Sequence, residues 1–381
     1  MHLCLATDFF YPRVGGVETH VYNLARTAIR RGYRATIVTT VGGKRIIENL
    51  DGINVVRVQY PKISGFFWLY GLERRLYIVL KKLSPDIIHV HHAFSPMGLV
   101  ASAVAKKLDI PVILTNHSIP LAYESFRLVW NYFSRIFLLY HEMRNIKKYD
   151  AVIAVSPLAA EYIRIYYPYE DKIFLIPPPV DDEFFSVESS KEEIGFGEED
   201  SIVLFVGRPS AKKGIEFALY SFRIVARLEP RAKLCIVGPI EGGYKYVLRS
   251  LIRSWDIEDR VVFMGKVSRE YLRKIYSAAD IFIFPSYGGE SFGLVVLESM
   301  ATGTPVVTTR GGALGKYISR YRLGVVTGFN PKKFAGAILF LLRNEELRTA
   351  MGSRAKKFAR IFSWNRLFDK IEEVYRMVMD K

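Results

Sequence analysis

The stretch Ile176-Pro177-Pro178-Pro179-Val180-Asp181-Asp182 divides the chain into two similar halves. Proline lacks a backbone N–H and has a fixed φ, so three consecutive prolines cannot continue a helix or a central strand. The segment is therefore predicted to be a stiff connector, and an acidic, turn-rich stretch, Val187–Asp200, follows it. With 381 residues, the chain has about two to three times the length of a typical domain, which favours a division at this point.

On both sides of the connector, short β-branched runs alternate with helical stretches. This alternation is typical of βαβ units and a parallel sheet. The strand-like runs before the connector are His2–Thr7, Ala35–Thr40, Asn54–Val58, Ile87–His91, Val112–Asn116, Ala151–Val155 and Lys172–Ile176. Those after it are Ile202–Val206, Ala232–Val237, Val261–Met264, Ile281–Pro285, Pro305–Thr309 and Gly324–Val326. Helical spacing marks Val17–Arg31 and Gly98–Leu108 as two of the helices between them.

We therefore expect an α/β protein of two doubly wound, Rossmann-like parallel-sheet domains that face each other across a cleft. The first domain is predicted to comprise residues 1–180 with a returning C-terminal helix within 364–381, and the second to comprise residues 181–363. A helix over Trp364–Met379 that only caps the second domain is the alternative. Ligands of open α/β sheets bind beyond the carboxyl ends of the strands, so motifs that directly follow strands are the candidates for chemistry.

Composition narrows the class of protein. Half of the residues are apolar and 24% are charged, which fits a globular chain and not a disordered one. No window of about 18 uninterrupted apolar residues occurs, and the chain enters a strand-like run at His2, so neither a membrane span nor a signal peptide is predicted. The two cysteines, Cys4 and Cys235, lie far apart in apolar runs, which favours buried thiols, a reducing compartment and a cytoplasmic protein.

The net charge of +16, from 54 basic and 38 acidic residues, is spread over both halves of the chain. The sequence has no basic tail and no recognisable nucleic-acid motif, so nucleic acid is not a predicted partner. A surface for phosphate-bearing small molecules or for an anionic membrane suits this distribution better.

A glycine-containing loop follows the first strand of each half. Gly15 and Gly16 precede a predicted helix, where backbone N–H groups can approach an anion; a simple glycine turn is the alternative. Their spacing is not Gly-x-Gly-x-x-Gly, so a dinucleotide fingerprint is not supported. In the second half, Gly207-Arg208 and Lys213-Gly214 place two cations on one loop, which predicts a diphosphate clamp in preference to a solvated basic loop.

The most specific motif runs from Glu290 to Glu298, where a glycine-rich loop ends and a helix is predicted to begin near Phe292. Glu290 precedes the helix and Glu298 lies about two turns into it. Carboxylates suit sugar hydroxyls, whereas the first amides of a helix suit a phosphate. Glu298 is embedded among apolar residues, where an unpaired charge is costly, so a functional role is favoured over a solvated face. The amides proposed to hold the phosphate belong to Ser291, Phe292, Gly293 and Leu294.

Histidines end two neighbouring strands. His89 and His91 share a strand face, which raises the possibility of a metal ion, but zinc needs three or four converging ligands and no acidic or cysteine cluster is near in sequence. No metal site is therefore predicted. His117, at the carboxyl end of a strand, is the better active-site candidate, with a structural histidine as the alternative.

With these elements in this order, the chain resembles the retaining, nucleotide-sugar-dependent glycosyltransferases of family 4, which have the GT-B fold. Glu290 and Glu298 correspond to the Glu-x7-Glu signature of that family, and Arg208 and Lys213 to its phosphate clamp. His117 corresponds to its cleft histidine. Within the family, the segment Asp8-Phe-Phe-Tyr-Pro and the following Gly-Gly-Val-Glu-Thr-His look most like the branch of the phosphatidylinositol N-acetylglucosaminyltransferase catalytic subunit.

One element departs from the family pattern. The usual Gly-Gly-x-Pro-Glu reads Gly311-Gly312-Ala313-Leu314-Gly315 here, and Lys316 follows it. A lysine near the place of an acid puts the family's donor contacts of this loop in doubt, and with them the usual donor.

The resemblance implies an enzyme that needs no cofactor and no metal and that uses a nucleotide diphosphate sugar, with UDP as the expected nucleotide. It implies that Arg208 and Lys213 neutralise the departing diphosphate, aided by the helix-start amides. Glu290 would bind the transferred sugar, N-acetylglucosamine or a hexose, and Glu298 the ribose. His117 would contact the sugar or the acceptor.

The expected acceptor is a membrane lipid, an inositol phospholipid among them, or a glycan. The segment Phe66–Leu83 is aromatic and basic together, as is Phe126–Lys148. Such a helix fits either peripheral binding to the cytoplasmic face of an anionic membrane or ordinary core packing. A sugar-nucleotide epimerase of the same fold and a non-catalytic basic binding protein are the alternative functions.

Overall fold

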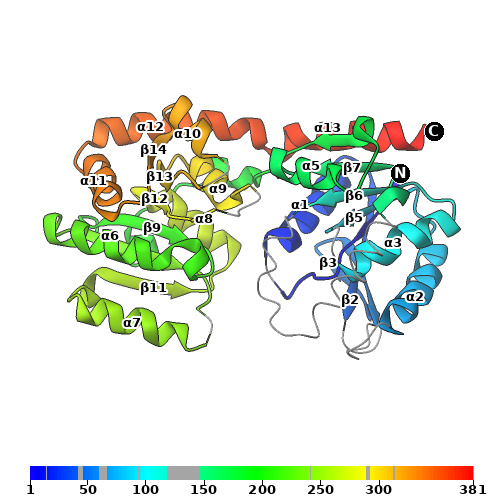
Figure 1. Cartoon of the computed structure of the whole chain (residues 1–381), viewed down its shortest axis with the longest axis horizontal. Coiled ribbons are helices and arrows are strands. Elements are labelled where there is room, and N and C mark those ends of the chain that lie inside the picture. The colour runs from blue at the N-terminus through cyan, green and yellow to red at the C-terminus, as the bar shows by residue number, and fades with distance from the viewer. Residues whose placement is uncertain are drawn as a thin grey trace. The chain divides into compact units, whose positions relative to one another are not determined.

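The computed structural model describes residues 1–13, 15–41, 46–59, 67–92, 95–117, 146–240, 242–288, 292–311 and 314–380. The chain divides into two compact units: the first comprises Met1–Pro179 with Trp364–Lys381, and the second comprises Val180–Ser363. Each unit is built on its own twisted sheet with helices packed on it (Figure 1). The predicted fold class, two doubly wound parallel-sheet α/β domains, is confirmed.

The first unit has the strand order β3-β4-β2-β1-β5-β6-β7-β8, in which β3 alone among these strands is antiparallel to its neighbour. Its strands are β1 (His2–Ala6), β2 (Arg34–Val41), β3 (Ile46–Leu50), β4 (Ile53–Gln59), β5 (Ile87–His91), β6 (Val112–Asn116), β7 (Ala151–Ala154) and β8 (Ile173–Leu175). Its helices are α1 (Gly16–Arg30), α2 (Phe67–Leu83), α3 (Pro96–Lys107), α5 (Pro157–Arg164) and α13 (Trp364–Met379). The strand order reverses between β1 and β5, so this is the point where a doubly wound sheet binds ligands.

Strand β3 is the element that the sequence analysis missed. Its side chains are largely exposed, so it lacks the apolar run that marks the other strands. It is held by a hairpin to β4 through Asp51 and Gly52, whose φ angles of 51° and 83° suit a tight turn of this kind. The Asn49 side chain accepts a hydrogen bond of 3.0 Å from the Gly52 N–H. The Asp-Gly pair was therefore the available signal for this strand.

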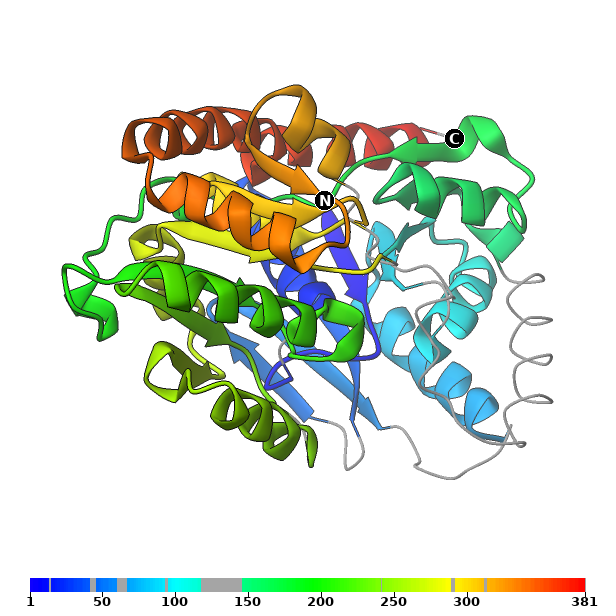
Figure 2. The ribbon, with the colours of Figure 1, turned by 60° about the vertical axis from the view of Figure 1, so that its left-hand side comes forward.

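The second unit has the strand order β11-β10-β9-β12-β13-β14, all parallel. Its strands are β9 (Ser201–Val206), β10 (Ala232–Val237), β11 (Val261–Gly265), β12 (Ile281–Phe284), β13 (Val306–Thr309) and β14 (Gly324–Thr327). Its helices are α6 (Ile215–Leu228), α7 (Tyr244–Ser254), α8 (Arg269–Ala278), α9 (Leu294–Thr302), α10 (Gly315–Arg320), α11 (Pro331–Leu342) and α12 (Glu345–Ala359). Helices α6 and α11 pack together on one face of the sheet (Figure 2). The order reverses between β9 and β12, which makes this the expected ligand-binding edge.

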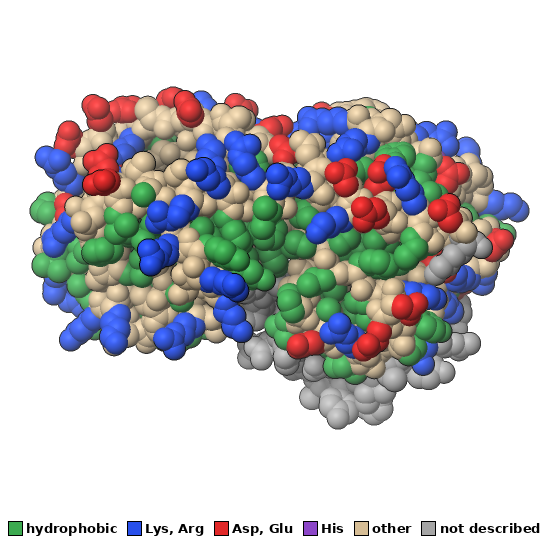
Figure 3. Space-filling view, turned by 90° about the horizontal axis from the view of Figure 1, so that it is seen from above, with side chains coloured by type: hydrophobic (Ala, Val, Ile, Leu, Met, Phe, Trp, Pro, Cys, Tyr) green, Lys and Arg blue, Asp and Glu red, His purple; other side chains and the backbone are tan. Residues whose placement is uncertain are grey.

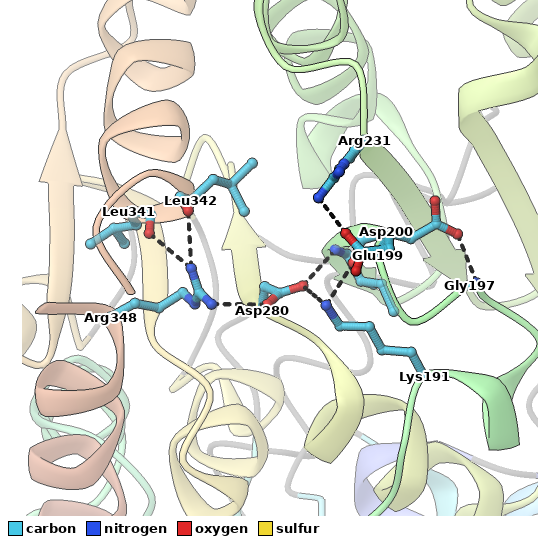
Figure 4. A network of polar contacts seen from close by, with 10 residues as sticks. Lys191, Gly197, Glu199, Asp200, Arg231, Asp280, Leu341, Leu342 and Arg348 are labelled. Carbon is cyan, nitrogen blue, oxygen red and sulfur yellow. Dashed lines mark hydrogen bonds and ion pairs between the residues drawn. The ribbon is translucent and has the colours of Figure 1, made fainter. Parts of the chain in front are cut away.

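A mostly buried aspartate, with 11% of its side chain exposed, fastens the segment after the connector to this second sheet (Figure 4). Asp280 precedes β12, and its carboxylate accepts a hydrogen bond of 2.8 Å from the Ile202 N–H. Lys191 and Arg348 pair with the same carboxylate at 3.1 and 3.2 Å. Lys191 also donates to the backbone oxygen of Asp200 at 2.6 Å. The entry to β9 is thus fixed by side chains from three distant parts of the sequence.

The last helix, α13, packs on the first unit. Arg31, at the end of α1, pairs with Asp369 at 3.0 Å and donates to the backbone oxygen of Asn365 at 3.1 Å. The Tyr33 hydroxyl hydrogen-bonds to Glu372. The side chains predicted to share one face of this helix are buried: Leu367, Ile371, Val374, Tyr375 and Val378.

Helix α2 packs its described apolar side chains into the core of the first unit. Leu72, Leu76 and Leu80 are fully buried there, whereas Ile78 is exposed. Over these turns the helix packs in the core, as the alternative interpretation of Phe66–Leu83 predicted. Phe66 itself and most of Phe126–Lys148 lie outside the described residues. Within the described part of the chain, no helix combines the length and apolar character needed to cross a bilayer. On the face shown in Figure 3, basic side chains are spread among acidic ones.

Candidate active site

The carboxyl edge of the second sheet is built by close backbone contacts between glycines and neighbouring loops. Gly207 follows β9 and Gly238 follows β10; a Cβ atom on Gly238 would lie 2.1 Å from the Gly207 oxygen. Gly214, with a φ of 71°, starts α6, and a Cβ there would lie 2.1 Å from the oxygen of Pro285, which follows β12. Gly311, after β13, approaches the oxygen of Ser286 in the same way, at 2.7 Å. Only glycine allows these approaches, so the four loops form one packed edge.

The two cations of the predicted diphosphate clamp lie on this edge. Arg208 follows Gly207 and is exposed, whereas Lys213 is half-buried. The Lys213 ammonium lies 6.0 Å from the centre of the Phe284 ring, at the carboxyl end of β12. The strand-to-helix loop therefore carries its cations to the point where the strand order reverses.

Helix α9 begins beside the same phenylalanine. It starts at Leu294, two residues later than the sequence analysis expected, because Gly293 adopts a left-handed conformation with a φ of 89°. A Cβ atom on Gly293 would lie 3.8 Å from the Phe284 ring. The first amides of α9 and the Lys213 ammonium therefore flank one side chain. Glu290 and Ser291 lie outside the described residues, whereas Phe292, Gly293 and Leu294 are described.

Glu298 is buried in α9 and paired. Its carboxylate accepts hydrogen bonds from Arg269 at 2.9 Å and from the Tyr276 hydroxyl at 3.2 Å, both from α8. The Arg269 guanidinium also lies 4.9 Å from the centre of the Phe184 ring. Burial raises the pKa of Tyr276, and the neighbouring Glu298 carboxylate adds to the effect, so the phenol stays protonated as a donor. The embedded charge therefore has a partner within the unit, which sequence reasoning had not identified.

The loop that departs from the family pattern lies along the same edge. Gly311 makes its close approach there, and Lys316 is exposed in the first turn of α10. Gly312 and Ala313 lie outside the described residues.

In the first unit, the glycine loop before α1 is occupied by a side chain of the helix itself. Glu18 is buried, and a Cβ on Gly15 would lie 2.5 Å from its carboxylate. Gly16 has open space around it. Arg13 pairs with Glu18 at 3.2 Å, and burial raises the pKa of Glu18. An anion approaching Gly15 would therefore meet a carboxylate, which favours the alternative of a structural glycine turn for this residue.

The histidines of β5 and β6 gather with one from α1. His91 Nδ1 and His117 Nε2 are 3.1 Å apart, and the ring of His20 lies 4.7 Å from that of His117. His89 is held separately: its ring nitrogens hydrogen-bond to the hydroxyls of Tyr375 at 2.8 Å and Thr115 at 2.6 Å. The structure thus brings His20 and His117 to His91, where the sequence had suggested His89.

These imidazoles are neutral at physiological pH. Burial lowers the pKa of His20 to about 3. Burial also holds the pKa values of His91 and His117 well below the usual range, and for these two the neighbouring histidines add to the effect. His117 is the partly exposed member of the three. Sequence reasoning missed His20, although its position four residues before the buried Leu24 puts a polar ring on the apolar face of α1.

Two family models together match most of the chain. Residues 14–184 match the model named Glycosyltransferase Family 4, and residues 186–358 match the model named Glycosyl transferases group 1. An uncharacterized glycosyltransferase of Methanocaldococcus jannaschii is 30% identical over 100% of this chain and 99% of its own length. A D-inositol 3-phosphate glycosyltransferase of Kineococcus radiotolerans is 27% identical over 95% of this chain and 90% of the relative.

Other relatives and solved structures agree. An alpha-monoglucosyldiacylglycerol synthase of Streptococcus pneumoniae is 28% identical over 89% of this chain and 78% of the relative. Sucrose-phosphate synthase from Thermosynechococcus elongatus superimposes with a TM-score of 0.79 at 21% identity, covering 100% of this chain and 99% of that structure. The Anabaena protein HepE in complex with UDP-glucose gives a TM-score of 0.78 at 17% identity, covering 99% and 100%. This chain therefore belongs to the family 4, group 1 glycosyltransferases and is an enzyme of the GT-B fold.

Proposed function

We propose that this glycosyltransferase takes its sugar from a nucleoside diphosphate sugar, with UDP as the nucleotide, and transfers it to a lipid or glycan acceptor with retention of configuration. The observation that carries the donor assignment is that the Lys213 ammonium and the start of α9 both lie near the ring of Phe284. A cation and the first amides of a helix are groups that suit a diphosphate. The complex of HepE with UDP-glucose supports the same choice.

The proposed chemistry needs charge stabilisation more than proton transfer by the protein. The bond between C1 of the sugar and the diphosphate oxygen breaks, and a bond between the acceptor oxygen and C1 forms on the same face. The acceptor's proton goes to the departing diphosphate. Arg208, Lys213 and the α9 amides offset the negative charge that builds there, as preorganised groups do in a transition state.

Other residues take the roles that the family resemblance implies. In this proposal Glu290 binds hydroxyls of the sugar, and His117 contacts the sugar or the acceptor. Glu298 binds the ribose in addition to its protein partners. A carboxylate has about four lone-pair positions, and Arg269 and Tyr276 use one on each oxygen, so acceptor capacity remains for a hydroxyl. No metal ion is required for the leaving group, because the cations and amides are built into the protein.

The proposed acceptor is a lipid with a polar headgroup, and an inositol phospholipid is the first candidate. One relative supports a lipid acceptor, because its name specifies a glycosylated diacylglycerol. Another supports an inositol phosphate as the acceptor's polar group, because its name specifies inositol 3-phosphate. The transferred sugar in this proposal is N-acetylglucosamine or a hexose.

The test is a transfer assay with the full chain, UDP-glucose or UDP-N-acetylglucosamine, and vesicles that contain phosphatidylinositol or diacylglycerol. A glycolipid whose anomeric configuration matches the donor is the expected product. Its formation should be lost in Lys213→Ala and kept in Lys332→Ala, a matched control at an exposed lysine of the same unit. Rapid epimer formation without acceptor would support the epimerase alternative, and equal rates in both variants would refute the assigned diphosphate site.

A further inference from the structure

Three histidines from separate elements of the first unit bring ring nitrogens together. His20 comes from α1, His91 ends β5, and His117 directly follows β6. One nitrogen of each lies within 4.8 Å of the corresponding nitrogens of the other two. The cluster lies at ligand-binding positions of a doubly wound sheet, because β5 is one of the two strands at which the order reverses.

Several of these nitrogens have no hydrogen-bond partner among the described residues. Both ring nitrogens of His20 and Nε2 of His91 are buried and unpaired there. His20 is only 6% exposed and His91 is fully buried. Buried polar groups in native proteins almost always have a partner, so this concentration of exceptions points to a ligand.

The spacing of the ring nitrogens suits the binding of one metal ion. Two nitrogen ligands on a tetrahedral zinc ion are about 3.3 Å apart, given zinc–nitrogen distances of about 2.0–2.1 Å. His91 Nδ1 and His117 Nε2 are 3.1 Å apart, and a ring nitrogen of His20 lies within 4.8 Å of a nitrogen of each. His117 is partly exposed, which leaves the fourth position open to water. Three imidazoles with an open fourth position match a known arrangement for Zn²⁺.

Neighbouring side chains pack against the imidazole rings of the cluster. His89, with both nitrogens hydrogen-bonded, packs its ring 4.3 Å from that of His91. Trp364 packs 5.1 Å from His20.

We infer that His20, His91 and His117 form a binding site for one transition-metal ion of the zinc class. The group contains no carboxylate, so Mg²⁺ and Ca²⁺, which prefer oxygen ligands, are not expected to bind it. The site does not depend on the proposed function, because no step of the transfer passes through the ion. One consequence does rest on that function: an ion on His117 removes this imidazole from the substrate, so Zn²⁺ should inhibit transfer.

The test is calorimetric titration of the chelator-treated full chain with Zn²⁺, and with Mg²⁺ as the comparison. The expected result is one Zn²⁺ per chain, with affinity reduced at least about tenfold in His20→Phe, which keeps an aromatic ring in place. The control His2→Gln removes a histidine outside the cluster and should bind Zn²⁺ as the wild type does. Absence of saturable Zn²⁺ binding, or equal affinity in His20→Phe, would overturn the proposal.

If circular dichroism shows that His20→Phe does not fold, a second measurement tests the metal site. Co²⁺ is titrated into the wild-type chain, and its visible spectrum is followed together with X-ray absorption of the Zn²⁺-loaded protein. A four-coordinate Co²⁺ spectrum and three imidazole ligands support the site. A six-coordinate, oxygen-only environment contradicts it. Both readouts concern metal binding alone, so they separate this site from a failure of the proposed transferase reaction.

Discussion

The two units each contain a buried polar cluster, and the clusters differ in residue type and in how many of their atoms have partners. In the second unit, both carboxylate oxygens of the buried Glu298 have partners in α8. In the first unit, His20 and His91 are neutral, and three of their nitrogens are unpaired among the described residues. The Glu298 cluster joins α8 to α9 and keeps spare acceptor positions, whereas the histidine cluster contains buried nitrogens that a ligand could pair.

The cations of the second unit differ in exposure and in the part of the unit in which they lie. Arg269 is held by Glu298, and Asp181 lies 3.7 Å from it. Arg208 is exposed on the ligand-binding edge and Lys213 is half-buried there. We therefore expect Arg269 to contribute to stability, and Arg208 and Lys213 are the residues proposed to bind the donor, so variants at these positions can separate the two roles.

The largest effect is expected for turnover. Arg208→Ala and Lys213→Ala should each lower the transfer rate by about 10²–10³-fold, because each removes a preorganised charge from the leaving group. Thermal unfolding should change little for the exposed Arg208. Steady-state kinetics and a melting curve for each variant provide the check; a near-normal rate with a large loss of stability would reverse the assigned roles.

The next largest effect is expected for stability. Arg269→Met leaves the Glu298 carboxylate buried without its cation. This should lower the free energy of unfolding by about 3 kcal/mol. We expect the lower end of the range for a broken buried pair because the Arg269 side chain is 26% exposed. Denaturant unfolding measures this. Arg253→Met is the matched control, since its pair with Glu258 is exposed and should be worth less than about 1 kcal/mol. Similar losses in both variants would remove the distinction between the clusters.

A smaller effect is expected from the glycine contacts that shape the ligand-binding edge. Gly214→Ala combines a φ of 71° with a Cβ placed 2.1 Å from the Pro285 oxygen, so it should cost about 2 kcal/mol and weaken nucleotide binding. Gly336→Ala, in α11 with open space around it, should stabilise the unit by about 0.5–1 kcal/mol. In denaturant unfolding, the free energy of unfolding should fall in Gly214→Ala and rise in Gly336→Ala. A loss in both variants would show that the backbone contact at Gly214 is not the cause.

The smallest effect concerns an acid of the first unit. Burial raises the pKa of Asp8 to about 6, and its Oδ2 has no partner among the described residues. The neutral acid is favoured in the folded state, so this group's stabilising contribution is full below the unfolded pKa and is lost as the pH rises through about 6. Between about pH 5 and pH 7 the loss should be about 1 kcal/mol.

Asp8→Asn tests this sign, because the amide keeps an acceptor for the Met97 N–H. The stability of the variant relative to the wild type should increase as the pH rises over this interval. Thermal melts at the two pH values supply the measurement, and a pH-independent difference would show that Asp8 is charged in the folded protein.

Much of the fold was predictable because parallel strands buried on both faces appear as continuous apolar runs. Ile87–His91 and Val112–Asn116 are fully buried strands of this kind. Strand β3 was missed because exposed strands lack that run, and only the Asp51-Gly52 turn marked it. The position of Arg208 and Lys213 after β9 was also predictable, since a strand-to-helix loop must reach the sheet edge.

Side-chain pairing between helices was not predictable. The bond from Arg269 to Glu298 depends on how α8 packs on α9, and no local pattern in the sequence encodes that contact. The same applies to His20, whose approach to His91 and His117 follows from packing α1 against the carboxyl ends of β5 and β6. Sequence patterns located the edges where ligands bind, whereas tertiary packing determined which polar groups remain available there.

We propose that the carboxyl edge of the second sheet binds a nucleoside diphosphate through Lys213 and the start of α9. Calorimetric titration of the wild-type chain, Lys213→Ala and Lys332→Ala with UDP, GDP and ADP measures this binding. UDP should bind saturably, at least about tenfold more weakly to Lys213→Ala because a charge-assisted contact is lost, and equally well to Lys332→Ala and the wild type. Binding that is equally strong in all three proteins, or no binding of any of the three nucleotides, would contradict the proposal.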